Sequence, residues 1–173
     1  MNRAPVVLKW SLNRRLNAVE VTVRDHLKFE SAFFRMRAIN RLLQNGGMED
    51  LKLRRAALVG SLREAMENHL NTEEELLVPE YAALPGLKSE GKRTLDDHKQ
   101  LRSLLKELQP PSISARTFDR KLNQLVESFS QHAHHEEQVV LPLLTRHLSP
   151  ARLDLLGHQM ISSKKPKKME SAA

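Results

Sequence analysis

Apolar residues recur every three or four positions along four long segments of the chain, which is the spacing of amphipathic helices. Turn-forming sequences separate these segments, and no segment alternates with the period of two that marks a strand. The predicted helices run from about Leu12 to Leu43, Glu49 to Tyr81, Glu90 or Thr94 to Leu108, and Ala115 to Leu148. Four long helices with short connections predict an all-α, up-down-up-down four-helix bundle.

The two ends of the chain fall outside these four segments. Ser149 and Pro150 have the form of a helix N-cap followed by proline at the first helical position, which predicts a short helix from Ala151 to about Met160. We therefore expect an N-terminal arm, the bundle, a short fifth helix and a disordered basic tail. These parts are predicted at residues 1–15, 16–148, 149–161 and 162–173.

Length and composition fit one soluble domain, because the chain has 173 residues, of which 40% are hydrophobic and 28% charged. No apolar run approaches the roughly 20 residues of a membrane span, and the N-terminus has no long apolar segment of the kind found in secretory signals. We expect a cytoplasmic protein with no membrane partner. The net charge is +7, but only 4% of the residues are aromatic, so a nucleic-acid partner is not expected. The sequence does not indicate an oligomeric state.

Polar residues interrupt the apolar stripe of the fourth predicted helix. At helical spacing the stripe leads into His132 and Glu136, and its earlier members are Phe118, Leu122, Leu125 and Phe129. The second helix repeats the arrangement with His69 and Glu73. In both copies the pattern is His, three residues, Glu-Glu, four residues and Pro. Because positions i and i+4 lie on one face of a helix, each His–Glu pair can aim at one point inside the bundle.

The other two long helices each carry one histidine in the apolar stripe, His26 in the first and His98 in the third. The stripe predicted for the first helix is Val19, Val23, His26, Glu30, Phe33 and Arg37, with Leu27 and Phe34 beside it. Glu30, one turn after His26, is a further candidate as a ligand or as an acceptor behind one. Burying such groups without partners costs several kcal/mol, and a metal ion would partner several at once. The predicted dinuclear metal site consists of His26, His69, Glu73, His98, His132 and Glu136.

The donors in this set are imidazole nitrogens and carboxylate oxygens, and Glu73 and Glu136 could each bridge two ions. A metal-free core of hydrogen-bonded histidines is the alternative.

The chain has no cysteine, which excludes disulfides, thiolate zinc sites and iron–sulfur clusters. The donors suit iron, manganese or zinc, and the pattern does not choose among them. Because an imidazole must be neutral to bind a metal, we expect metal loss below about pH 6.

The motifs resemble those of the hemerythrin-like (HHE cation-binding) domain, and the resemblance covers about Val19 to Leu148. The matching motifs are Asp25-His26, His69-x3-Glu73-Glu74 with Pro79, Asp97-His98, and His132-x3-Glu136-Glu137 with Pro142. The resemblance implies a four-helix bundle that holds two iron ions with an oxo or hydroxo bridge. It also implies that the six residues named above are the metal ligands, and that a small diatomic molecule or a peroxide is the physiological ligand.

One position departs from the pattern of the respiratory hemerythrins, which carry a second histidine four residues after the ligand of the third helix. In this chain that position is Arg102. A carboxylate such as Glu30, or water, would then complete the set, or Arg102 would lie near the site and tune it. The departure favours sensing, storage or small-molecule detoxification over simple reversible carriage of O2.

We therefore expect a non-haem di-iron protein that reacts with or senses O2, peroxide or nitric oxide. The alternative is a basic helical adaptor that binds an anionic partner through its termini, with the metal acting only as a structural staple. The sequence assigns no catalytic residue apart from the expected metal ligands, and it leaves open whether the protein is an enzyme.

Overall fold

The computed structural model describes residues 16–46, 49–108 and 113–163. The predicted N-terminal arm, residues 1–15, lies outside the described part of the chain, and so does the basic segment 164–173. The described residues form helices, turns and short connections, and none of them lies in a strand. The all-α prediction is therefore confirmed.

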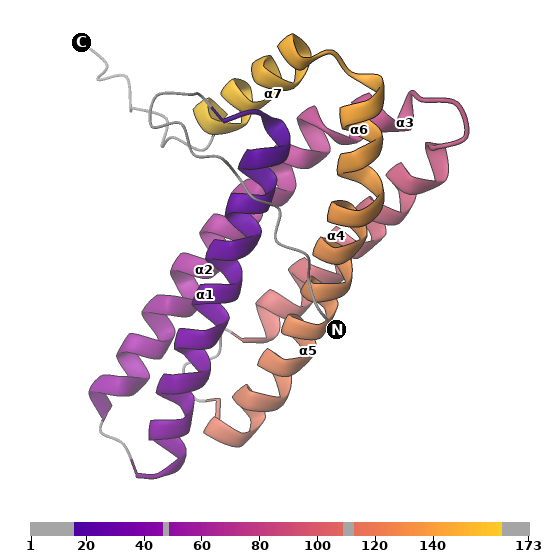
Figure 1. The fold of residues 1–173 in the computed structure, drawn as a ribbon. Coiled ribbons are helices and arrows are strands. Elements are labelled where there is room, and N and C mark those ends of the chain that lie inside the picture. The colour runs from indigo at the N-terminus through magenta and orange to yellow at the C-terminus, as the bar shows by residue number, and fades with distance from the viewer. Residues whose placement is uncertain (1–15, 47–48, 109–112, 164–173) are drawn as a thin grey trace, which may run out of the picture.

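Four long helices run antiparallel to their chain neighbours and form the bundle (Figure 1). They are α1 (Ala18–Gln44), α2 (Glu49–Leu76), α4 (Lys88–Glu107) and α5 (Ala115–His135). Helix α1 packs against α2 and α5, and α4 packs against α2 and α5. This order of neighbours is the up-down-up-down bundle expected from the sequence. None of the helices in the described residues is long and apolar enough to cross a membrane.

In both helices that carry a His-x3-Glu motif, the regular α-helix is interrupted shortly after the motif. Helix α2 ends at Leu76, and α3 (Val78–Ala82) continues in its place with Pro79 in its first turn. Helix α5 passes into a π-helical turn, η1 (Glu136–Val140), and then into α6 (Leu141–His147), which contains Pro142. Proline lacks the N–H that an α-helix needs at this position, and the wider π turn accommodates the break.

Helix α1 begins six residues later than predicted, because a capping box fixes its start. The Asn17 side chain accepts a hydrogen bond from the Glu20 N–H at 3.0 Å, and the Glu20 carboxylate accepts one from the Asn17 N–H at 2.9 Å. These two bonds satisfy backbone donors that a helix start otherwise leaves without partners.

The stripe predicted for α1 was only partly correct. Leu27 and Phe34 are 56% and 74% exposed, and Glu30 is also exposed. His26 and Phe33 are buried as predicted, whereas Arg37 is exposed, and the inward face also contains Val21, Phe29 and Met36. Helix α1 carries apolar residues on two faces, so hydrophobic spacing alone could not identify the buried one.

Two apolar clusters fill the bundle on either side of a layer of buried polar residues. One lies among α1, α2, α4 and α5 and contains Phe29, Phe33 and Phe129. The other contains Tyr81 and Leu144, and it is completed by α7 (Pro150–Ser163), which packs against α1 and α2. The predicted fifth helix is therefore present, and it extends to Ser163, two residues into the segment predicted as tail. It closes the end of the bundle where α1 begins (Figure 1).

The contact between α7 and the start of α1 depends on Gly157, because a β-carbon there would lie 2.4 Å from the Leu16 carbonyl oxygen. We expect Gly157→Ala to lower the free energy of unfolding by about 1 to 3 kcal/mol, since backbone cannot easily move aside. Gly60→Ala is the control, because its added methyl group would meet no atom within 4 Å and the position lies in exposed helix. That variant should be neutral or stabilised by up to about 1 kcal/mol. Urea unfolding compares the two, and equal stabilities would contradict this account of α7 docking.

Candidate metal centre

The structure brings the six predicted ligands together between the two apolar clusters. Each of the four bundle helices contributes one histidine, α2 also contributes a glutamate, and η1, which continues α5, contributes the other. All six side chains are buried, with at most 2% exposure: His26, His69, Glu73, His98, His132 and Glu136. Side chains from all four helices therefore place their metal-binding atoms in one buried layer of the bundle.

Each of the two glutamates lies between histidines from two different helices. Glu73 Oε1 is 3.3 Å from His69 Nε2, and Glu73 Oε2 is 3.5 Å from His98 Nε2. Glu136 Oε2 is 3.3 Å from His26 Nε2 and 3.6 Å from His132 Nε2. All four histidines therefore turn Nε2 toward a central carboxylate, and the two halves of the bundle repeat the same arrangement.

Two overlapping groups of these atoms lie close enough to hold a metal ion. One group is His26, His69, His132 and Glu136, and the other is Glu73, His98 and His132, with the ligand atoms of each group within 4.8 Å of one another. Four nitrogen and two oxygen donors could serve two ions, with carboxylates shared between them. The geometry is therefore compatible with a dinuclear site.

The partners of the buried polar atoms indicate whether the cluster is better suited to a metal ion or to a metal-free network of hydrogen-bonded histidines. The buried atoms Nε2 of His26, His98 and His132 have no hydrogen-bond partner within the described residues, and neither have Oε2 of Glu73 and Glu136. Leaving one buried polar group unsatisfied costs about 1 to 3 kcal/mol. These five atoms approach one another at 3.3 to 3.6 Å without forming hydrogen bonds, so a positive charge between them, a proton or a metal ion, is needed. Because these atoms all face the centre, the donor set fits a metal better than a hydrogen-bonded core.

A second set of carboxylates lies behind the histidines, one for each ring. Glu137 Oε1 is 3.0 Å from His26 Nδ1, and Glu74 Oε1 is 2.9 Å from His98 Nδ1. At the other two rings, the carboxylates of Asp25 and Asp97 are each 3.9 Å from Nδ1, of His69 and His132 respectively. A carboxylate hydrogen-bonded behind a metal-binding histidine fixes the ring orientation and leaves Nε2 for the metal, as Glu137 and Glu74 do here. The 3.9 Å contacts of Asp25 and Asp97 are charge contacts beyond hydrogen-bond distance.

These outer carboxylates form a closed ring around the bundle. Asp25 on α1 faces the histidine of α2, Glu74 on α2 faces that of α4, Asp97 on α4 faces that of α5, and Glu137 on η1 faces that of α1. Sequence reasoning assigned no role to Asp25 and Asp97. The repeated Asp-His pair was the available signal, but each aspartate supports a histidine of the next helix and not its own neighbour.

The structure places Arg102 and Glu30 outside the inner cluster. Arg102 Nη1 donates to Glu74 Oε1 at 2.6 Å, while its other nitrogens bind Glu67 at 2.9 Å and Asn71 at 2.7 Å. Because Glu74 also contacts His98, Arg102 reaches the centre only through this carboxylate. Glu30 is exposed on α1 and belongs to neither group of possible ligands.

Aromatic and hydroxyl side chains border the cluster. Phe29 lies edge-on to His69 and Phe129 edge-on to His26, with ring centroids 5.1 Å and 5.5 Å apart. The Tyr81 hydroxyl is also buried, and its pKa is raised by burial and by the charges of Glu136 and Glu73. The Thr22 hydroxyl, also buried, donates to Glu73 Oε1 at 3.4 Å. The site is therefore bordered by aromatic rings and by the hydroxyls of Tyr81 and Thr22.

Burial disfavours charge on every group of the cluster, and the neighbours decide which groups stay charged in the absence of metal. Burial alone would lower the pKa of His26, but contacts with Glu136 and Glu137 outweigh it and raise the pKa to about 10. Burial lowers the pKa of His132 to about 4. Burial and the charge of Glu136 raise the pKa of Glu73 to about 7. The metal-free cluster therefore holds protons at neutral pH that a metal must displace.

These pKa shifts predict that metal affinity rises with pH. His26 must lose a proton and Glu73 must be ionised to bind, and their pKa values of about 10 and about 7 lie at or above neutrality. Each displaced proton changes affinity about tenfold per pH unit, so Zn²⁺ affinity should fall about 10- to 100-fold per unit between pH 8 and pH 6. Competition with a chelator of known pH dependence measures this. An affinity that is constant across that range would contradict the predicted proton displacement.

The ring of outer carboxylates predicts a loss of affinity when one of them is neutralised. Glu74→Gln keeps the side-chain shape but removes the charge behind His98, and we expect Zn²⁺ affinity to fall about tenfold or more. Glu75→Gln is the matched control, because Glu75 is exposed and next in sequence. Chelator competition at one pH compares the two variants. Equal affinities would show that the carboxylate behind His98 does not support the site.

Comparison with known proteins agrees with this geometry. The Hemerythrin HHE cation binding domain matches residues 17–144, which include all six inner residues and all four outer carboxylates. No curated protein matches the chain significantly. The family match covers well over half of the 173 residues. The chain therefore belongs to the hemerythrin HHE cation-binding domain family.

Proposed function

We propose that this protein holds two iron ions in the buried cluster and uses them to react with or sense O2, peroxide or nitric oxide. The observation that supports this most strongly is the convergence of inner histidine and carboxylate atoms, five of which have no hydrogen-bond partner within the described residues. The proposed ligands are His26, His69, Glu73, His98, His132 and Glu136, with Glu73 and Glu136 shared between the ions. The choice of iron over manganese or zinc rests on membership of the family.

The residues around the two ions would orient the ligands, exclude water and supply a hydrogen-bond donor. Bound iron supplies redox chemistry and coordination positions for a small ligand. The outer carboxylates orient the four rings, and the apolar clusters on either side exclude water. The buried Tyr81 hydroxyl would serve as a hydrogen-bond donor and not as an acid, because its raised pKa keeps it protonated.

The depth of the site supports a small ligand. The six proposed ligand side chains are at most 2% exposed, so a large organic substrate could reach them only if the helices separated. Six protein donors for two ions also leave coordination positions for water or a diatomic molecule. Because Arg102 stands where the respiratory hemerythrins have a histidine and is bound to Glu74, sensing, storage or detoxification fits this chain better than O2 carriage. The cytoplasmic location stays a prediction.

The direct test combines metal content with optical spectra. After anaerobic reconstitution, the wild-type chain should hold about two iron ions and show a new charge-transfer band when O2 or peroxide is added. The Glu73→Ala/Glu136→Ala double variant should lose most of the iron, because it lacks both shared carboxylates. Full iron occupancy in this variant would overturn the proposed site.

The control for this experiment is Glu75→Ala/Glu127→Ala, which removes one exposed glutamate from α2 and one from α5. It should keep its iron and its spectrum. Circular dichroism of both double variants shows whether each remains helical, which separates loss of the site from loss of the fold. A spectrum that does not respond to O2, peroxide or nitric oxide in an iron-loaded wild type would overturn the proposed reactivity.

A further inference from the structure

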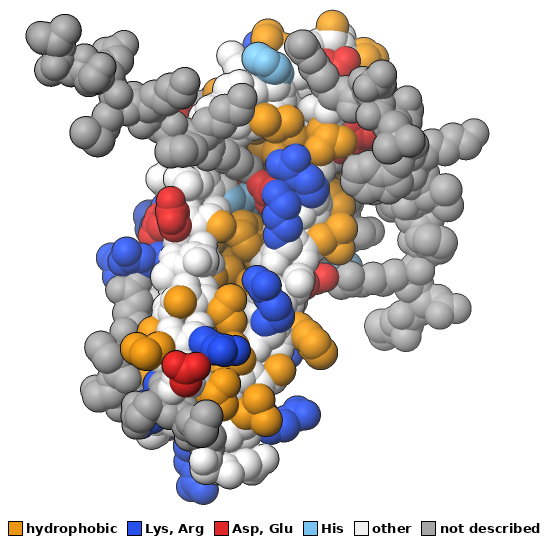
Figure 2. All heavy atoms as spheres, turned by 90° about the vertical axis from the view of Figure 1, so that its left-hand side faces the viewer, with side chains coloured by type: hydrophobic (Ala, Val, Ile, Leu, Met, Phe, Trp, Pro, Cys, Tyr) orange, Lys and Arg blue, Asp and Glu red, His pale blue; other side chains and the backbone are white. Residues whose placement is uncertain are grey.

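The outer face of α1 and α2 contains an elongated cleft that is separate from the buried cluster. Two adjoining depressions of about 810 Å³ and about 550 Å³ follow the line between the helices. They share Arg35, Leu58 and Ser61, so they form one continuous cleft. Figure 2 shows this face, with hydrophobic side chains gathered between the helices and a row of lysine and arginine side chains beside them.

The cleft explains why α1 has a second apolar face. Leu27 and Phe34, which are 56% and 74% exposed, line it from α1. Leu58 lines it from α2. Single exposed apolar side chains are ordinary, but a row of them along one cleft marks a surface suited to binding.

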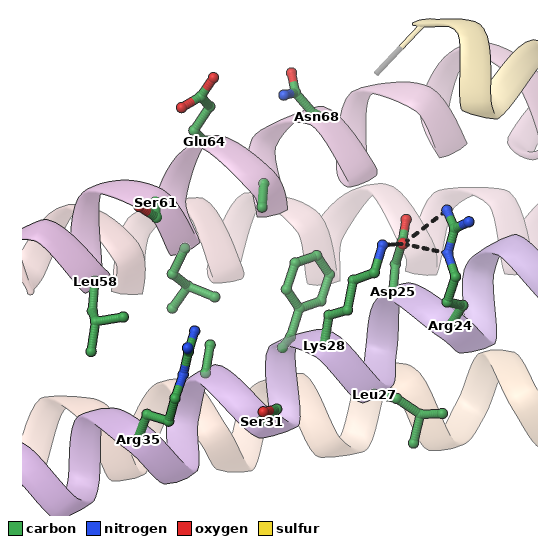
Figure 3. Close-up of a pocket in the computed structure, with 14 residues that line it drawn as sticks. Arg24, Asp25, Leu27, Lys28, Ser31, Arg35, Leu58, Ser61, Glu64 and Asn68 are labelled. Atoms are coloured by element: carbon green, nitrogen blue, oxygen red, sulfur yellow. Dashed lines mark hydrogen bonds and ion pairs between the residues drawn. The ribbon is translucent and has the colours of Figure 1, made fainter. Parts of the chain in front are cut away.

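Basic side chains dominate the charged groups of the cleft. The two depressions are lined by Arg24, Lys28, Arg35 and Arg54, against the acidic Asp25 and Glu64. Arg24 and Lys28 both bind Asp25 Oδ1, at 3.4 Å and 3.1 Å. Figure 3 shows these two residues turned toward Asp25 at one end of the cleft, while Arg35 extends into the space between the helices. Arg35 makes no hydrogen bond or ion pair with the described part of the chain.

The shape and charge of the cleft favour an acidic amphipathic helix. A groove between two antiparallel helices accepts a third helix, which buries its apolar face there. From Leu27 to Ile39 the cleft follows α1 for about 18 Å, which corresponds to about three helical turns. Glutamate or aspartate on the flanks of the incoming helix would meet Arg35, whereas Arg54 is ion-paired with Asp50 at 3.5 Å. A second copy of this chain fits less well, because it would bring the same basic side chains face to face.

The floor of the cleft contacts the proposed metal centre. Asp25 lines the cleft and its Oδ2 lies 3.9 Å from His69 Nδ1. Phe29 also lines the cleft, and its ring centroid lies 5.1 Å from that of His69. A helix bound in the cleft would thus lie against two residues that contact this histidine from outside.

We propose that this cleft binds an acidic amphipathic helix of a partner protein, and that the affinity depends on whether metal occupies the buried site. The second part rests on the proposed function, because it requires metal at His69. Coupling between two sites is reciprocal, so a helix that binds one metal state more tightly also stabilises that state. Binding of the partner at the cleft would thereby depend on whether metal occupies the buried site.

The test selects peptides by their charge. A displayed library of 18-residue helices carries leucine on one face and random Glu, Lys or Ser on the others, and it is selected against the full chain. We expect Glu to be enriched over Lys, and the selected peptide to bind Arg35→Glu at least tenfold more weakly than wild type. Arg120→Glu is the control, because it makes the same charge change on exposed α5 and should alter affinity less than twofold.

Several outcomes would overturn the docking site. One is enrichment of Lys over Glu in the selected peptides, and another is equal affinity of the selected peptide for Arg35→Glu and Arg120→Glu. A third is self-association of the chain that Phe34→Ser abolishes, because this would assign the cleft to a second copy. Coupling is tested by fluorescence anisotropy of the selected peptide with and without bound Zn²⁺, and we expect at least a threefold difference in Kd. Equal Kd values in a chain shown to hold Zn²⁺ would overturn the coupling but not the metal site. Failure of the wild-type chain to hold iron in the reconstitution described above would overturn the proposed function and leave the docking result intact.

Discussion

The constraint on which the rest of the structure depends is the burial of four imidazoles and two carboxylates in one layer of a helical bundle. Their inner atoms have lost water, and several have no replacement partner among the described residues. A shared cation is the simplest compensation for this cost, because one ion can partner several donors at once. The apolar clusters above and below then have two roles, since they stabilise the bundle and keep the polar layer dry.

Contacts between neighbouring helices of the bundle orient the histidine side chains of the cluster. Each outer carboxylate comes from one helix and supports the histidine of the next, so no single helix can shift without disturbing a ring on its neighbour. Arg102 extends this network to the surface through Glu74. On the α1–α2 side, Asp25 belongs both to this ring and to the external cleft. Metal binding, helix packing and the outer surface are therefore connected through the same few side chains.

The sequence predicted the fold and the inner residues because the paired motifs leave little ambiguity. In α5 the apolar stripe has one direction, and His132 and Glu136 interrupt it in register. In α1 two apolar faces compete, and the face with Leu27, Phe34 and Glu30 proved to be exposed. The supporting role of Asp25 could not be predicted from spacing within one helix, because its partner lies on another. The π turn at Glu136 was also missed, since it depends on how the bundle accommodates Pro142.

The position of bound iron in the crystal would show whether the buried layer is a metal site. Crystals of the iron-loaded protein, measured at the iron absorption edge, would give an anomalous difference map. We expect two peaks in the layer between Glu73 and Glu136, each within bonding distance of Nε2 atoms of the surrounding histidines. A map with no peak in this layer, or with iron only at surface carboxylates, would contradict this expectation.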